Sequence, residues 1–255
     1  MPIKNFVPLL YFAALFTVNS VAAENDQRSL SAWEGHYIGF TTGVSSANAD
    51  PTVNAKAKGY FITTDPGQTD PQASRDLEAT NVTGSLFWGL NRQIGNKVYG
   101  LEVDLSLTDY NEQYTSGNIS YLTAPASTFS VVTNVKSDWA VGLRARLGYI
   151  REKSLFYVSA GPSIRQFKYD FTFTDTFHPQ LINVNESKWN LGWTVGLGYE
   201  MKLPSTWSLK TELLHSSYKD IVDAQSTTIG YPNDGFTHKL DFTEQSLRIG
   251  LYRKF

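Results

Sequence analysis

Two pairs of charged residues stand at alternate positions in two short apolar stretches. Glu102 and Asp104 lie in GLEVDLSLT, and Arg144 and Arg146 lie in GLRARLGYI. Neighbouring carboxyl groups could perform general acid–base chemistry if one of them kept its proton. Arginines facing them would instead keep both carboxylates ionised, because a nearby opposite charge favours the charged form. We therefore expect ion pairs rather than catalysis at these positions.

A histidine and a serine two positions apart are the second combination that could carry chemistry. His215 could act as the base for a nucleophilic Ser217 if Asp220 or Asp223 oriented the imidazole. This spacing, with both residues on the outward side of a strand, resembles that of some lipid A deacylases that are small eight-stranded barrels. The rest of the chain does not resemble them. We favour the alternative, a structural histidine among the aromatic residues at a membrane interface.

Metal, disulfide and nucleic-acid chemistry have little support in the composition. The 255 residues include no cysteine, and the four histidines, at positions 36, 178, 215 and 238, do not show the spacing of zinc ligands. We expect no metal site and no cofactor. The formal net charge of -2 gives no argument for a nucleic-acid partner.

Strands must position the charged residues, because apolar and polar residues alternate around them with a period of two. In the stretch from Trp189 to Glu200, for example, Leu191, Trp193 and Val195 share one face. Eight stretches of this kind can be followed along the chain, at 33–44, 82–91, 98–108, 139–149, 155–165, 189–201, 207–215 and 242–255.

The connections between these stretches alternate between short and long. Short ones lie around 94–96, 151–154 and 203–206, whereas the long ones, 45–80, 109–136, 168–188 and 216–238, are mostly polar. Strands of about ten residues with one apolar face match a tilted membrane crossing, and this sorting of connections is typical of outer-membrane barrels. A soluble β-sandwich needs no such sorting. We therefore predict an all-β fold: an eight-stranded antiparallel up-and-down transmembrane β-barrel with four long extracellular loops and three short periplasmic turns.

If the apolar faces point outward, charged residues of both signs point into the barrel. They are Glu102, Asp104, Arg144, Arg146, Arg165, Glu200, Lys210, Glu212 and Arg248. An eight-stranded barrel is just wide enough for side chains to fill it, so we expect a plugged lumen. The set could form a gate or a polar ligand site, but we favour a structural salt-bridge network, because buried charges must be paired in any case.

The N-terminus has the pattern of a secretory signal. Lys4 precedes the apolar run FVPLLYFAALF, and Val21-Ala22-Ala23 supplies small residues before a cleavage site. We expect a cleaved signal peptide at 1–23, a short periplasmic lead at 24–32 and the barrel at 33–255. A retained transmembrane helix is the weaker alternative, because the run is short and contains Pro8.

Five motifs occur in order along the chain: WEGHYIGFTTG, GLEVDLSLTDY, GLRARLGYI, GWTVGLGYE with WSLKTELL, and the C-terminal GLYRKF. Together they resemble the outer-membrane β-barrel proteins of Gram-negative bacteria, of the porin-family, opacity-type surface antigens. The resemblance implies an eight-stranded barrel in the cell outer membrane with its N-terminus in the periplasm. It also implies insertion by the outer-membrane assembly machinery, which reads a terminal aromatic residue such as Phe255.

Members of this family are variously minor porins, surface antigens and haem-binding proteins, so the resemblance implies location better than activity. Our first hypothesis is a monomeric, non-enzymatic surface protein with a structural or surface-interaction role, surrounded by outer-membrane lipid and lipopolysaccharide, with a possible extracellular ligand at its loops. The second is a minor porin or a barrel that binds haem or another small ligand. The third is a lipid A hydrolase that uses His215 and Ser217.

Overall fold

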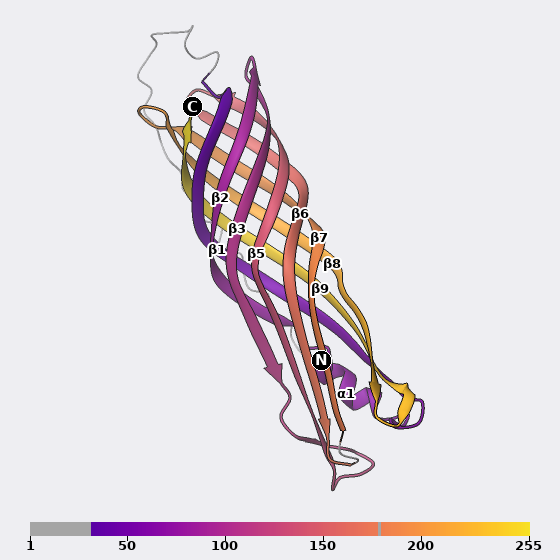
Figure 1. The fold of residues 1–255 in the computed structure, drawn as a ribbon. Helices are drawn as coiled ribbons and strands as arrows, with labels where there is room; N and C mark the ends of the chain where they lie inside the picture. Colours follow the sequence, from indigo (N-terminus) through magenta and orange to yellow (C-terminus); the bar gives the residue numbers. More distant parts are fainter. Residues whose placement is uncertain (1–31, 178–179) are drawn as a thin grey trace. The chain divides into compact units, whose positions relative to one another are not determined.

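The computed structural model describes residues 32–177 and 180–255, and the unit from Trp33 to Phe255 consists mainly of antiparallel strands (Figure 1). The predicted signal peptide at 1–23 and all but the last residue of the 24–32 lead lie outside the described residues. The elements are β1 (Gly35–Lys56), α1 (Pro66–Ala73), β2 (Leu77–Ile94), β3 (Lys97–Thr115), β4 (Ile119–Ser120), β5 (Thr128–Arg151), β6 (Ser154–Asp175), β7 (Gln180–Lys202), β8 (Trp207–Thr228) and β9 (Tyr231–Lys254). In the described ranges, α1 is the only helix, and it is too short to cross a membrane.

The strands close into a ring. The first strand, β1, pairs with both β2 and β9, and β3 pairs with β5, so the sheet has no open edge between its first and last long strands. Leaving out the two-residue β4, which pairs only with the end of β5, the nine strands of the sheet give a ring of eight. The predicted eight-stranded antiparallel barrel is confirmed.

Three short turns lie at one end of the barrel, which we call the turn end. They occupy residues 95–96, 152–153 and 203–206, where the sequence predicts short connections. Gly95, Glu152 and Ser205 have φ angles of 60°, 56° and 75° there. The left-handed conformation allows the chain to reverse within a few residues. The opposite end, which we call the loop end, carries α1 (Figure 1).

The prediction of four long loops is wrong in detail, because the strands run well beyond the predicted boundaries. Only the connections 57–76 and 116–127 are long, whereas those between β6 and β7 and between β8 and β9 shrink to 176–179 and 229–230. A strand of 22 residues tilted by about 40° reaches roughly 55 Å along the barrel axis, against about 30 Å for the hydrocarbon core. Much of the barrel therefore stands outside the membrane.

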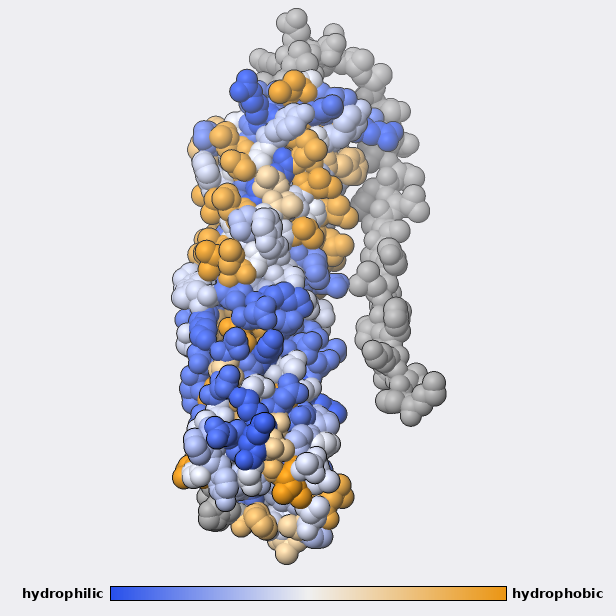
Figure 2. Space-filling model, turned by 90° about the vertical axis from the view of Figure 1, so that its right-hand side faces the viewer, coloured by the Kyte–Doolittle hydropathy of each residue, from blue (hydrophilic) through white to orange (hydrophobic). Residues whose placement is uncertain are grey.

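The physical reason for the longer strands is that the alternation of apolar and polar residues inverts along the barrel. Toward the turn end of β6, Phe156 and Val158 point outward and are 50% and 52% exposed. Toward the loop end, Phe167, Phe171 and Phe173 point inward and are buried. Lipid favours an apolar outer face, whereas water favours a polar outer face around an apolar interior. Figure 2 shows the same division, with apolar residues gathered toward the turn end and polar ones toward the loop end.

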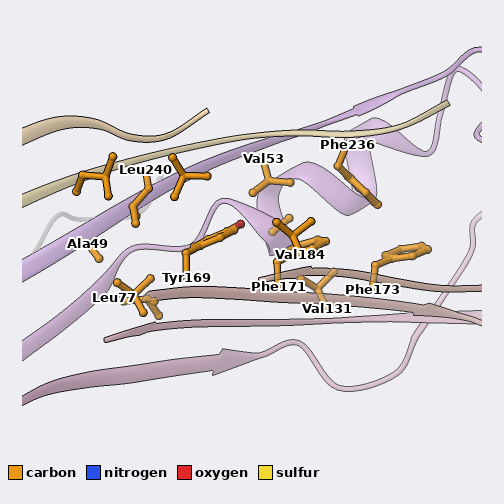
Figure 3. Packing of buried hydrophobic residues seen from close by; sticks show 14 of the residues in the cluster. Ala49, Val53, Leu77, Val131, Tyr169, Phe171, Phe173, Val184, Phe236 and Leu240 are labelled. Carbon is orange, nitrogen blue, oxygen red and sulfur yellow. The ribbon is translucent and has the colours of Figure 1, made fainter. Parts of the chain in front are cut away.

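The loop-end half is filled by a continuous apolar core (Figure 3). Phe171, Phe173 and Phe236 are fully or almost fully buried, and the rings of Phe171 and Phe173 pack against the Phe236 ring, edge-on and tilted respectively. Phe61, from the connection before α1, packs against Phe173 and Phe236. This core packs the interior of the loop-end half, so the barrel continues beyond the ion-paired half as a filled structure.

Candidate functional site

The lumen of the turn-end half is occupied by an ion-pair network centred on Glu102. Its Oε1 lies 2.7 Å from Nη2 of Arg144, and its Oε2 lies 3.1 Å from Nη1 of Arg146. The ammonium group of Lys210 donates to both oxygens at 2.7 Å. One carboxylate thus holds three cations, and these come from two different strands, β5 and β8.

The network continues from these cations to three more carboxylates. Arg144 contacts Asp104 at 3.3 Å, from Nε to Oδ1, and Glu212 at 3.2 Å, from Nη1 to Oε1. Arg146 donates from Nη2 to Oε1 of Glu200 at 2.6 Å. Lys210 also lies 3.2 Å from Glu212. The contacts of Arg144 with Glu212 and of Arg146 with Glu200 join β5 to β8 and to β7, so the network ties together strands that are not neighbours in the sheet.

Three tyrosines complete the hydrogen bonding of the carboxylates. Tyr37 donates to Glu102 at 2.9 Å, Tyr157 to Glu212 at 2.7 Å and Tyr252 to Glu200 at 2.7 Å. Glycines on the neighbouring strands make room for two of the rings. A Cβ on Gly89 would come within 2.1 Å of the Tyr37 ring, and one on Gly198 within 2.0 Å of the Tyr157 ring. The small residues on the inward faces therefore accommodate bulky neighbours.

A second, smaller cluster lies nearer the loop end. Arg165 forms an ion pair with Glu244, and Arg248 lies 3.9 Å from the same carboxylate. Arg248 also donates from Nη1 to Oγ of Ser106 at 2.8 Å. Arg248 and Glu212 lie at the same level along the barrel axis, because they are register partners on β9 and β8. The ion pairs of Glu212 are nevertheless with Arg144 and Lys210 and not with Arg248. Glu244 takes the place of Glu212 as the carboxylate that Arg248 faces.

All nine charged residues predicted to point inward do so, and each is buried. Sequence reasoning did not include Glu244 or the three tyrosines as part of the site. The alternation of the sequence could have identified Glu244, since it stands at every second position with Ser246 and Arg248 and so shares their inward strand face. With Glu244 included, the carboxylates of Glu102, Asp104, Glu200, Glu212 and Glu244 match the cations of Arg144, Arg146, Arg165, Lys210 and Arg248 one for one. The arrangement is a neutral, interlocked plug.

The pair His215 and Ser217 lies on the outer face of β8. His215 is exposed, and Ser217 is partly exposed. Within residues 32–177 and 180–255, no hydrogen bond joins His215 to Ser217, Asp220 or Asp223. A serine nucleophile needs a base within hydrogen-bond reach and a group that orients the base. The geometry needed for acyl chemistry is therefore not assembled here.

The C-terminal Phe255 lies at the turn end beside the start of β1. Its amide donates to the carbonyl of His36 at 3.0 Å, and the two rings stack with their centroids 6.1 Å apart. The phenyl ring is 69% exposed. It is therefore accessible on the surface of the barrel. In the described part of the chain, no group of three His, Cys, Asp or Glu side chains is placed to hold a metal ion.

Among the described residues, His238 is the histidine that is buried in the apolar core of the loop-end half. Its Nδ1 lies 3.1 Å from the Tyr169 hydroxyl and its Nε2 lies 3.0 Å from Oγ of Ser226. The rings of Phe171 and Phe236 flank it. Burial lowers the pKa of His238 to about 4, because the charged form would lose its hydration in this core.

The stability of the loop-end half is expected to fall on acidification because of His238. An unfolded histidine has a pKa of about 6.5, so on acidification the unfolded state takes up the proton first. This contribution is fully kept above about pH 6.5 and is lost progressively down to pH 4, to a total of about 3 kcal/mol. Hydrogen exchange of the β9 amides, corrected for intrinsic rates, measures the change. A neutral His238→Gln variant should lack this slope, and an identical slope in both proteins would contradict the assignment.

Comparison with known proteins places this geometry among outer-membrane barrels. A family model described as outer membrane protein beta-barrel domain matches residues 11–243. The 31 kDa outer-membrane immunogenic protein of Brucella melitensis is 28% identical over 98% of this chain and 99% of its own length. The 22 kDa outer membrane protein of Rhizobium leguminosarum is 25% identical over 92% of this chain and 83% of its own. Among solved structures, the outer membrane protein OprG of Pseudomonas aeruginosa is similar with a TM-score of 0.46 and 13% identity, over 87% of this chain and 96% of that one.

Proposed function

This chain belongs to the outer-membrane protein β-barrel family, and we propose that within the family it is a non-enzymatic, non-conducting surface protein. It is an integral protein of the cell outer membrane. In barrels of this type the short turns face the periplasm. With that orientation, the apolar-cored half with α1 stands outside the cell as a rigid platform. The relatives named as immunogenic outer-membrane proteins support such exposure.

The observation that carries the proposal is the filled lumen. Every charged residue of the network is at most 7% exposed, and the half beyond it is packed with phenylalanine and tyrosine rings. A porin needs a continuous aqueous path, and this one is blocked twice, by ion pairs and then by an apolar core. The minor-porin alternative is therefore disfavoured, and the lipid A hydrolase alternative lacks the assembled His215 and Ser217 geometry.

Further partners follow from the same proposal. Outer-membrane lipid and lipopolysaccharide surround the outward apolar residues of the turn-end half. The outer-membrane assembly machinery recognises the exposed Phe255. A variant that lacks this terminal aromatic ring should therefore insert into the membrane more slowly than the wild type. The barrel acts as a monomer, since its ring closes on itself and leaves no strand edge between β1 and β9 for another chain to pair with.

The wild-type protein is expected to produce no reproducible conductance steps in planar lipid bilayers. The ion pairs between β5 and β8, such as Arg144 with Glu212, close the lumen, and opening a path would break several buried contacts together. A general porin measured in the same bilayers provides the positive control, and heat-dependent gel mobility shows that the inserted barrel is folded. Steps comparable to those of the porin would overturn the proposal.

A further inference from the structure

A cavity of about 250 Å³ opens at the loop end of the barrel. Three segments that are far apart in the sequence form its wall. The connection before α1 supplies Tyr60, Ile62 and Asp65, the connection after β4 supplies Tyr121, and the end of β6 supplies Asp175 with the adjacent Phe177. The cavity is separate from the ion-pair network, which lies in the turn-end half.

The first carboxylate of the cavity, Asp175, is held firmly. Its Oδ2 accepts hydrogen bonds from the hydroxyl groups of Tyr60 at 2.7 Å and Tyr121 at 2.5 Å. Its Oδ1 accepts one from the amide of Phe177 at 2.6 Å. These bonds fix the two aromatic rings beside the carboxylate. The aromatic walls and the negative charge therefore keep a constant geometry.

The second carboxylate, Asp65, has an oxygen that the protein leaves unsatisfied. The residue is only 7% exposed, and its Oδ2 accepts from the amide of Ile62 at 2.9 Å. Its Oδ1 is buried and has no hydrogen-bond partner among the described residues. Burial raises the pKa of Asp65, and the charges of Asp175 and Asp234 raise it further. A buried anion without a matching cation is costly unless a ligand supplies the cation.

The wall of the cavity is braced from behind. Gln68 of α1 donates to the carbonyl of Ser120 at 3.3 Å and accepts from the amide of Leu122 at 3.0 Å. Asp234 accepts from the amides of Tyr60 and Phe61 at 2.8 Å and 3.2 Å. The connections before α1 and after β4 are thus tied to the rest of the loop end. A preformed site avoids the cost of ordering loops on binding.

We propose that this cavity binds an alkylammonium group. Its nitrogen would donate to Oδ1 of Asp65 and lie against the rings of Tyr60 and Tyr121, which attract a cation to their faces. The alkyl or aryl part would contact Ile62 and Phe177, which are 47% and 65% exposed at the rim. Residues with basic side chains are absent from the described lining, so none competes for the carboxylates.

The site fits an organic cation better than a metal ion. Metal coordination needs several oxygen or nitrogen ligands around one point. The described residues contain no group of three acidic or histidine side chains placed in that way. Much of the remaining wall is aromatic or aliphatic. The ammonium group could belong to a free amine or to a lysine side chain of another protein, since both present the same chemistry.

The test measures binding of n-butylammonium to the full chain in nanodiscs by saturation-transfer NMR. Its neutral isostere 1-butanol is the matched probe, and this comparison needs no mutation. We expect butylammonium to bind at least about tenfold more tightly, because a hydrogen bond to a charged group contributes roughly that much. Equal binding of butylammonium and 1-butanol would overturn the proposal. So would a result in which sodium ions displace bound butylammonium as well as added butylammonium does.

An amino-acid substitution assigns the binding to Asp65. The variant Asp65→Asn keeps the acceptor for the Ile62 amide but removes the charge, so its dissociation constant should rise by about tenfold. Asp76→Asn removes the same charge from an exposed residue just after α1 and should leave binding unchanged. If both variants raise the dissociation constant equally, the binding depends on general surface charge and not on Asp65, which would contradict the proposal. A Gly-Lys-Gly peptide that binds as tightly as butylammonium would assign the ammonium to a protein, and its exclusion would assign it to a free amine.

Discussion

The substitution Glu102→Gln is expected to destabilise the folded barrel by about 3–5 kcal/mol, because it leaves buried cations without their shared anion. Glu102 is 2% exposed and contacts Arg144, Arg146 and Lys210. The amide would still accept hydrogen bonds but could not balance these charges. Urea unfolding of the lipid-embedded barrel, followed by heat-dependent gel mobility and tryptophan fluorescence, measures the loss.

A matched substitution at the surface separates burial from simple loss of charge. Glu186 forms a 3.2 Å ion pair with Lys188, and both side chains are partly exposed. Glu186→Gln should change the free energy of unfolding by no more than about 0.5 kcal/mol. The double variant Glu102→Gln with Lys210→Met should recover part of the loss, because it removes one of the unpaired cations. A similar small effect of Glu102→Gln and Glu186→Gln would show that the network does not stabilise the fold.

The second large effect is expected from Phe236→Ala in the loop-end half. Phe236 is fully buried, and its ring centroid lies 5.1–5.4 Å from those of Phe61, Phe171 and Phe173. Removing the ring leaves a cavity among side chains that several strands hold apart, at a cost of about 3–5 kcal/mol. Because the turn-end half has its own ion-pair network, we expect local loosening rather than loss of the whole barrel. Protease cleavage in 57–76 should become faster in the folded, membrane-inserted protein.

The control for this effect is a ring that the structure leaves in solvent. Phe177 is 65% exposed, so Phe177→Ala removes the same atoms without opening an internal cavity. Its effect on cleavage at 57–76 should be slight, since surface substitutions change stability by about 0.5 kcal/mol or less. If Phe236→Ala is cleaved no faster than Phe177→Ala, the aromatic core does not hold the loop-end half together.

The strands of the turn-end half could be predicted because their outer faces meet lipid, where an apolar residue at every second position is conspicuous. The same strands beyond the membrane were predicted as loops, because serine, threonine and asparagine on a water-facing strand have the composition of a loop. The stretch FKYDFTFTD in β6 does alternate with period two. Its apolar residues fall on the opposite face from those of the membrane half, so the change of solvent along one strand hides the pattern.

The inward residues of the network could also be predicted, and so could the pairing of Glu102 and Asp104 with the arginines of β5. The contacts that cross the lumen could not. Glu212 and Arg248 are neighbours in the register, yet Glu212 pairs with Arg144 on β5. Arg146 likewise reaches Glu200 on β7, and these strands are not adjacent in the sheet. Such contacts cross the lumen, so they depend on the closed ring and on its diameter. The spacing of residues along one strand does not indicate whether the ring closes or how wide it is.

The sequence by itself determined the eight long strands, the three short turns and most of the charged side chains that point into the turn-end half of the barrel, because backbone geometry imposes a side-chain period of two on any strand. Only the tertiary structure decided which charges meet across the lumen and how far the strands extend. It alone also brought Tyr60, Tyr121 and Asp175 to one cavity. The reason is physical: the side-chain period is a local property, whereas contacts between strands far apart in the chain exist only once the sheet has closed.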